Sequence, residues 1–309
     1  MAFGKLIQRI AATQNPTVVG LDPQLDFVPG FIREEAFARY GETPEGAAEA
    51  ILAYNKGLID AIWDIVPAVK PQSAFYEQFG WHGVRALAET VAYAKEKGLY
   101  VIMDAKRGDI GSTMSAYASA LLGTVRIGSS EREPFGADSL TVSGYLGSDC
   151  IDATLSLCEA RDRTIFVLVK TSNPSSGELQ DKSFPDGAVY EVMGRMCENW
   201  GAKTTHEYGY SAVGAVVGAT YPEQIVALRR QMPTSFFLVP GYGAQGGKAA
   251  DVAAAFDEKG LGAIVNSSRG IIAAYKKSGH DECDYALAAR EAALAMREDL
   301  MNYIPTITL

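Results

Sequence analysis

Short apolar runs alternate with segments of helical periodicity along the chain, and this alternation constrains the fold more than any other feature. The apolar runs lie at residues 17–22, 68–75, 99–106, 139–144, 164–172, 212–220, 236–243 and 263–269. Helical patterns lie between or after them at residues 44–66, 81–98, 112–124, 150–162, 187–200, 222–232, 248–258 and 284–303. Strands rich in Val, Ile and Leu that are separated by helices are typical of a parallel sheet covered on its outer face.

Eight such units in one chain predict an α/β fold, the (β/α)8 TIM barrel, in which residues 1–309 form a single domain. An open, doubly wound sheet is the alternative. A hydrophobic content of 48% over 309 residues is ample for one large core. Single residues indicate helix ends: Gly98 after one helix, and Ser112 and Pro222 at the start of two others.

The composition excludes several classes of partner. A net charge of −9 argues against a nucleic-acid-binding surface, which needs a basic face. No run of about 18 apolar residues is present to span a membrane, and the start, MAFGKLIQRIAATQ, reads as a short amphipathic helix without the apolar core of a signal peptide. The four cysteines lack CxxC spacing, which predicts reduced, buried thiols in a cytoplasmic protein: Cys150, Cys158, Cys197 and Cys283.

Polar residues gather where the predicted strands end, and barrel enzymes place their chemistry at these carboxyl ends. The first three strands contribute Asp22, Lys70 and the pair Asp104 and Lys106. Later strands end in Lys170–Ser172, Thr220, 240–245 and 266–269. Asp104 and Lys106 are two residues apart, so they share one face of their strand. We expect Lys70 and Asp22 to approach them from neighbouring strands.

Charged groups at the end of a buried strand cost several kcal/mol unless they are paired, so the cluster is either a structural ion-pair network or an active site. A lysine flanked by carboxylates is held as the ammonium. It is then a proton donor, whereas a Schiff-base role needs the neutral amine. Carboxylates beside a substrate also repel a negative group on it. The cluster therefore suits a reaction in which an anion leaves and a proton takes its place.

Two glycine-containing loops follow the last two strands, PGYGAQGG (240–247) and NSSRG (266–270). Barrels often bind phosphate at these loops through backbone N–H groups. Glycines let the backbone approach a ligand closely. Gln245 can donate an amide hydrogen bond, and Arg269 can contact two phosphate oxygens at once. The sequence therefore predicts a phosphate site here rather than two plain turns.

The segment DAKRGDIGST resembles the D-x-K-x-x-D-I-x-x-T signature of the orotidine 5′-phosphate decarboxylase family. GLDP, VKPQSAFYEQFG, TSNP, VVGATYPE, PGYGAQGG and NSSRG match that family in order, from residue 20 to about 275. The segments VKPQSAFYEQFG and NSSRG are similar in sequence to those of the longer bacterial subgroup (type 2). The resemblance implies decarboxylation of orotidine 5′-monophosphate to UMP and CO2, the last step of de novo UMP biosynthesis, without metal or organic cofactor.

The resemblance also implies a role for individual residues. Lys106 would protonate C6 of the pyrimidine, with Asp104 and Lys70 beside it. Asp22 and Lys70 would bind ribose hydroxyls, and Ser172 would contact the pyrimidine. Asp109, Ile110 and Thr113 would reach into the site of a second subunit, so that a homodimer shares its active sites. The phosphate would be surrounded by Pro240, Gln245, Ser268 and Arg269.

Three other readings remain open at this point. A metal-dependent sugar-phosphate aldolase shares the D-x-K-x-x-D barrel, although Lys70 places a cation where Mg²⁺ would need a ligand. A catalytically silent nucleotide binder would keep the phosphate loops but would not need Asp104, Lys106 and Asp109. A Schiff-base barrel enzyme is the third. The long segments 23–43 and 173–186 receive no assigned role.

Overall fold

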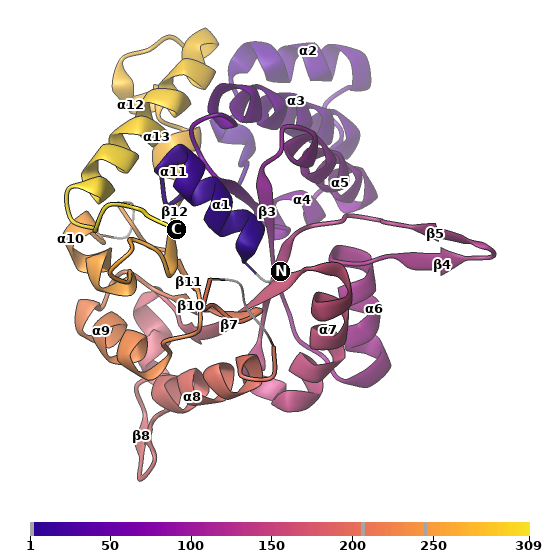
Figure 1. Ribbon diagram of the computed structural model, residues 1–309. Coiled ribbons are helices and arrows are strands. Elements are labelled where there is room, and N and C mark those ends of the chain that lie inside the picture. The colour runs from indigo at the N-terminus through magenta and orange to yellow at the C-terminus, as the bar shows by residue number, and fades with distance from the viewer. Residues whose placement is uncertain (1–2, 205–207, 244–245) are drawn as a thin grey trace.

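Eight parallel strands close into a barrel in the computed structural model, which describes residues 3–204, 208–243 and 246–309 (Figure 1). Around the barrel their order is β1, β12, β11, β10, β7, β6, β3 and β2. Pairing between β1 and β12, such as Thr17 with Val265, closes the ring. The barrel prediction is confirmed. The strands are β1 Thr17–Leu21, β2 Ala68–Pro71, β3 Tyr100–Arg107, β6 Ser139–Val142, β7 Thr164–Lys170, β10 Val213–Val217, β11 Phe237–Val239 and β12 Ala263–Ser267.

Helices surround the barrel, and their ends follow local chemistry. Thr43 accepts a hydrogen bond from the Gly46 N–H and caps a helix that begins with Pro44. Gly98 takes a left-handed φ of 78° after α5, and Pro222 begins α9, both as predicted. The helices are α1 Gly4–Thr13, α2 Gly30–Tyr40, α3 Pro44–Ile62, α4 Ala74–Glu77, α5 Gly80–Glu96, α6 Gly111–Leu121, α7 Ser148–Arg161, α8 Val189–Gly201, α9 Pro222–Gln231, α10 Ala249–Val252, α11 Arg269–Ile272, α12 Tyr275–Ser278 and α13 Tyr285–Met301.

Several local predictions are wrong. The strand predicted over 68–75 ends at Pro71, because the chain then turns into α4 to bury Tyr76. Ser112 does not cap α6, which begins one residue earlier after the extended Ile110. The helix predicted near 248–258 is shorter, a turn of α10 followed by the 3-10 helix Ala253–Ala255. All four cysteines are free, but Cys283 is exposed rather than buried.

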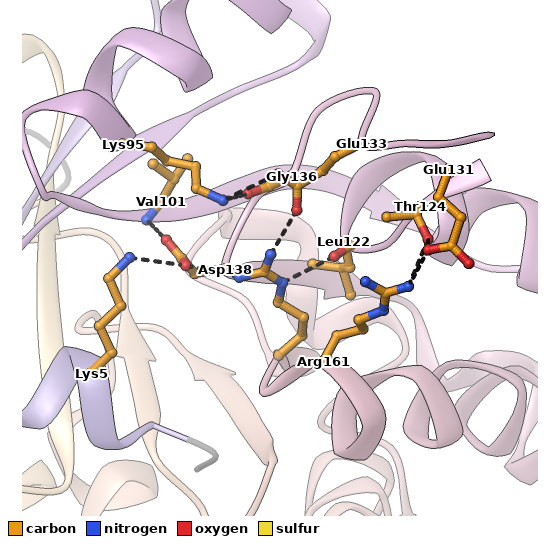
Figure 2. Close-up of polar contacts among 11 residues, drawn as sticks. Lys5, Lys95, Val101, Leu122, Thr124, Glu131, Glu133, Gly136, Asp138 and Arg161 are labelled. Carbon is orange, nitrogen blue, oxygen red and sulfur yellow. Dashed lines mark hydrogen bonds and ion pairs between the residues drawn. The ribbon is translucent and has the colours of Figure 1, made fainter. Parts of the chain in front are cut away.

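The amino-terminal end of the barrel is closed by α1 and a network of ion pairs. Phe3, just before α1, stacks on Phe236 and packs at a tilt against Phe166, each with ring centroids 5.0 Å apart. The buried Asp138, which precedes β6, accepts from Lys5 of α1 at 3.1 Å and from the Val101 N–H at 2.9 Å (Figure 2). Sealing this end leaves the opposite, carboxyl end of the strands open for a ligand.

Three long segments between the barrel strands and their helices, 23–43, 125–138 and 173–186, carry structure of their own. Segment 23–43 contains the 3-10 helix Leu25–Phe27 and α2. Segment 125–138 contains the hairpin of β4 Val125–Ile127 and β5 Ser130–Arg132, which projects away from the barrel (Figure 1). Segment 173–186 contains the 3-10 helix Pro174–Glu178 and the short strand β8 Ser183–Phe184, which pairs with β9 Gly187–Ala188. Within the described residues, no helix is sufficiently long and apolar to span a bilayer.

Candidate active site

A cavity of about 640 Å³ lies at the carboxyl ends of the strands, where the polar residues were predicted to meet. Its size is in the range of pockets for small organic ligands. Eight of the eleven predicted site residues that the structure describes line it: Asp22, Lys70, Asp104, Lys106, Ser172, Pro240, Ser268 and Arg269. Apolar side chains complete its wall, namely Phe27, Phe75, Leu168, Val216 and Leu238.

Asp104 is the centre of the charged part of the cavity. Its Oδ1 accepts from Lys106 Nζ at 2.6 Å and from Thr141 Oγ1 at 2.9 Å, and its Oδ2 accepts from Lys70 Nζ at 2.7 Å. Burial by itself raises the pKa of Asp104, but the charges of Lys70 and Lys106 lower it by a larger amount. The pKa of Asp104 therefore lies well below its usual range. Asp104 is therefore an anion that holds two ammonium groups in place.

Lys70 is the buried member of the pair of lysines. Its side chain is 5% exposed, and its Nζ lies 3.8 Å from Asp22 Oδ1 as well as beside Asp104. Burial lowers the pKa of Lys70, but the charges of Asp104 and Asp22 raise it by more, so the net shift is upward. Lys70 is thus a permanent cation. Its second partner, Asp22, has a 24% exposed side chain and lines the cavity.

Lys106 is held in an uncommon backbone conformation. Its φ is 46°, in the left-handed region that costs a non-glycine residue about 1–3 kcal/mol. The register between β3 and β6 shifts between Met103 and Arg107, which accommodates this turn. The Lys106 N–H donates to Thr141 Oγ1 at 3.0 Å, and that hydroxyl in turn donates to Asp104. The strained backbone presents a 45% exposed Lys106 side chain to the cavity.

Acid titration tests whether Asp104 is ionised in the folded state. Because the folded pKa is below the unfolded one, the stabilisation is full above the unfolded pKa and is lost as the pH falls towards the folded pKa. We expect the free energy of unfolding, measured with urea, to fall more steeply between about pH 5 and 2 in the wild type than in Asp104→Asn. The difference should be about 1–3 kcal/mol. Parallel pH profiles would contradict a depressed pKa at Asp104.

The predicted phosphate residues lie on the far side of the cavity from Lys106. Pro240 and Gly241 follow β11, and Ser268 and Arg269 follow β12. Gly241 has a φ of 100°, which a residue with a side chain rarely adopts. The next residue, Tyr242, donates from its hydroxyl to Asp299 Oδ2 at 2.6 Å and so ties this loop to α13. Gln245 lies outside the described residues.

Asp109, Ile110 and Thr113 do not line the cavity of their own chain. Asp109 is half-buried, and its Oδ1 accepts from the Ile110 N–H at 2.8 Å. Ile110 is 52% exposed, and Thr113 is exposed at the first turn of α6. These three residues therefore form an outward-facing edge beside the active-site strand β3.

The cavity also contains residues to which the sequence analysis gave no individual role. Thr141, on β6, binds both Asp104 and the Lys106 backbone. Asn266 is 8% exposed, and its Oδ1 has no hydrogen-bond partner. Gln24 and Phe27 come from segment 23–43 and line the cavity. The Tyr275 hydroxyl holds this segment by donating to the Phe27 carbonyl at 3.2 Å. A polar residue within an apolar strand was an available signal at Asn266, whereas a threonine such as Thr141 is ordinary in a strand.

The closed parallel barrel, the paired carboxylate and lysines at the ends of β1 to β3, and the loops after β11 and β12 define a barrel enzyme with a small-molecule site. A family model described as "Orotidine 5'-phosphate decarboxylase / HUMPS family" matches residues 48–280. The chain belongs to this family. The predicted resemblance is confirmed.

Individual relatives cover almost the whole chain. An orotidine 5′-phosphate decarboxylase of the bacterium Rhodopirellula baltica is 45% identical over 295 residues, covering 94% of this chain and 96% of its own. One from Caldicellulosiruptor saccharolyticus is 38% identical over 296 residues, covering 96% of each chain. The Leishmania donovani OMP decarboxylase structure has a TM-score of 0.71 at 31% identity, covering 96% of this chain and all of that one. These names confirm the predicted enzyme class, a carboxy-lyase.

Proposed function

We propose that the protein decarboxylates orotidine 5′-monophosphate to UMP and CO2 by protonating C6 from Lys106. The observation that carries this proposal is the Lys106 ammonium, which faces the cavity while Asp104 holds it at 2.6 Å. The bond between C6 and the carboxylate breaks, and its electron pair stays on C6. A proton from Lys106 Nζ then forms the new C6–H bond, and the neutral amine recovers a proton from solvent.

The charges around the cavity support this chemistry in two ways. Asp104 is a buried anion, so a substrate carboxylate placed beside it is repelled and is released as neutral CO2. Lys106 and Lys70 are fixed cations, so negative charge that develops at C6 is stabilised without rearrangement of the protein. Preorganised charges of this kind usually make a large contribution to catalysis.

The other lining residues would bind the remainder of the nucleotide. In this proposal Asp22 and Lys70 hold the ribose hydroxyls, and Ser172 contacts the pyrimidine. The phosphate lies against Pro240, Ser268 and Arg269, with Gln245 beside them. The supporting observation is their placement around the barrel, since β2 neighbours the Lys106 strand β3, β1 neighbours β2, and β11 lies opposite β3. Binding energy from the remote phosphate can then be used to lower the barrier at C6.

We further propose a homodimer in which Asp109, Ile110 and Thr113 complete the partner's site. Large apolar side chains are exposed beside these residues, which favours an interface. They are Ile110 just before α6, Tyr117 on α6 and, after the neighbouring strand β6, Tyr145 and Leu146. We propose that residues 1–309 act as one domain in the cytoplasm, without metal or organic cofactor.

Turnover of orotidine 5′-monophosphate in the presence of EDTA tests the function. We expect UMP to form at an unchanged rate. A loss of activity that Mg²⁺ restores would favour the aldolase-like alternative, and binding of UMP without turnover would favour the silent nucleotide binder. Trapping of substrate on Lys106 by borohydride would favour a Schiff base. The described residues contain no group of three or more His, Cys, Asp or Glu suited to a metal.

Arg269→Ala tests the phosphate contact. The KM for orotidine 5′-monophosphate should rise about ten- to a hundred-fold, because a charge-assisted hydrogen bond contributes about 1.5–3 kcal/mol. Turnover of orotidine, which lacks the phosphate, should be almost unchanged. Steady-state kinetics on both substrates measure this. Equal damage to both would mean that Arg269 has a structural role.

A further inference from the structure

Lys170 is a completely buried lysine that the cavity does not use. It is the last residue of β7 and has no exposed surface, and it is not among the lining residues although Leu168 and Thr171 are. The register between β10 and β7 shifts here, so that Val216 pairs with Leu168 but Val217 pairs with Lys170. This irregularity turns the Lys170 side chain towards the segment that follows β7.

The Lys170 ammonium is bound almost entirely by that following segment. Its Nζ donates to Asp181 Oδ1 at 2.7 Å and to Ser176 Oγ at 3.1 Å. It also lies 4.8 Å from the ring centre of Tyr221 and 5.7 Å from that of Tyr190, within cation–π range. Asp181 accepts a further hydrogen bond from Gln224 of α9 at 3.2 Å. Segment 173–181 is thereby fixed between β7 and α9.

The same segment sets the conformation of residues that face the cavity. Gln180, next to Asp181, accepts from the Thr171 N–H at 2.9 Å and donates to Thr171 Oγ1 at 2.8 Å. Thr171 Oγ1 in turn donates to Asn173 Oδ1 at 2.6 Å. Thr171, Ser172 and Asn173 all line the cavity. The hydrogen bonds of Asp181 and of its chain neighbour Gln180 therefore connect the ammonium to the wall of the active site.

A buried ion pair is a weak source of stability, since replacing it with apolar side chains of similar volume often leaves the free energy of unfolding unchanged or raises it. It does favour one arrangement of the groups around it, because any other arrangement leaves a buried charge without a partner. At Lys170 the arrangement so favoured is the folded-back conformation of segment 173–181.

We propose that Lys170 is a positioning residue for the active site, whose ammonium holds segment 173–181 so that Ser172 and Asn173 face the pyrimidine part of the substrate. This inference rests on the proposed function. It predicts that loss of the ion pair weakens substrate binding through the loop, without any contact between Lys170 and the substrate.

The test compares Lys170→Met and Asp181→Asn with a matched control, Lys5→Met. Lys5 also binds a buried aspartate, Asp138, but at the opposite end of the barrel (Figure 2). We expect both test variants to raise the KM for orotidine 5′-monophosphate about ten-fold or more, with a smaller change in kcat. Amide hydrogen exchange in residues 173–186 should also accelerate. Lys5→Met should change neither.

The outcomes separate this inference from the proposed function. Wild-type kinetic constants in both test variants, or a loss of kcat at unchanged KM, would overturn the positioning role. Unchanged exchange in residues 173–186 would overturn the role as well. If Lys170→Met does not fold, Asp181→Asn decides, since its side chain is 38% exposed and leaves Lys170 in place. An inactive wild type would instead refute the proposed function, and the exchange measurement would still test the contact.

Discussion

Lys106→Ala is expected to lower the turnover of orotidine 5′-monophosphate by at least about 10³-fold, because it removes both a general acid and a fixed positive charge. The fold should survive, since the Lys106 side chain is 45% exposed and Asp104 keeps its bonds to Lys70 and Thr141. Single-turnover kinetics would measure the loss, and calorimetry with UMP would show that the site still binds nucleotide.

Lys97→Ala is the control for the loss of a lysine. Lys97 follows α5, and it forms an ion pair with Asp60 rather than with any group of the cavity. We expect its turnover to equal that of the wild type. Near-normal turnover in Lys106→Ala would show that another group protonates C6, and the mechanism proposed here would have to be abandoned.

The fold was predictable because its main signal is spread over the chain. Strands that are buried on both faces must be apolar throughout, and the helices between them must be amphipathic, so both patterns can be read directly from the sequence. Errors arose where a few residues decide the outcome. At 68–75 the apolar run continues into α4, and apolarity alone does not distinguish the end of a strand from a buried helix.

The charged part of the site was predictable for a related reason. Asp104, Lys106 and Lys70 stand out because ionised groups at the end of apolar runs are expensive without partners. Thr141 carries no such signal, since a threonine is ordinary in a strand. Its role depends on the left-handed turn at Lys106, which brings the Lys106 N–H within 3.0 Å of its hydroxyl. That conformation coincides with the register shift between β3 and β6, which cannot be read from the sequence of either strand.

Lys170 shows the limit of arguments from strand position. The sequence places it with Thr171 and Ser172 at a strand end, and alternation predicts that it shares a face with Leu168, which lines the cavity. The register shift between β7 and β10 breaks that alternation, and Lys170 turns towards Asp181 instead. Segment 173–186 could not be assigned from the sequence because its contacts depend on this irregularity.

The second large expected effect is a change in activity when two inactive variants are mixed, and it tests whether two chains share each active site. Asp109, Ile110 and Thr113 lie at an exposed edge outside the cavity of their own chain. In a two-fold dimer, each chain would lend this edge to the other, giving two equivalent composite sites. Homodimers of Lys106→Ala and of Asp109→Ala should then both be almost inactive.

Mixing the two inactive variants should restore activity. In a mixed dimer, one site has lost both groups and the other has both. With random reassortment of equal amounts, half of the dimers are mixed, so about a quarter of all sites should be intact. Turnover should rise towards that fraction as native mass spectrometry shows the subunits exchanging. If the subunits exchange and turnover stays at the level of the parents, Asp109 acts within its own chain. The loss of activity in Asp109→Ala would then have to arise from the site of its own chain, and the proposed sharing of active sites would be wrong.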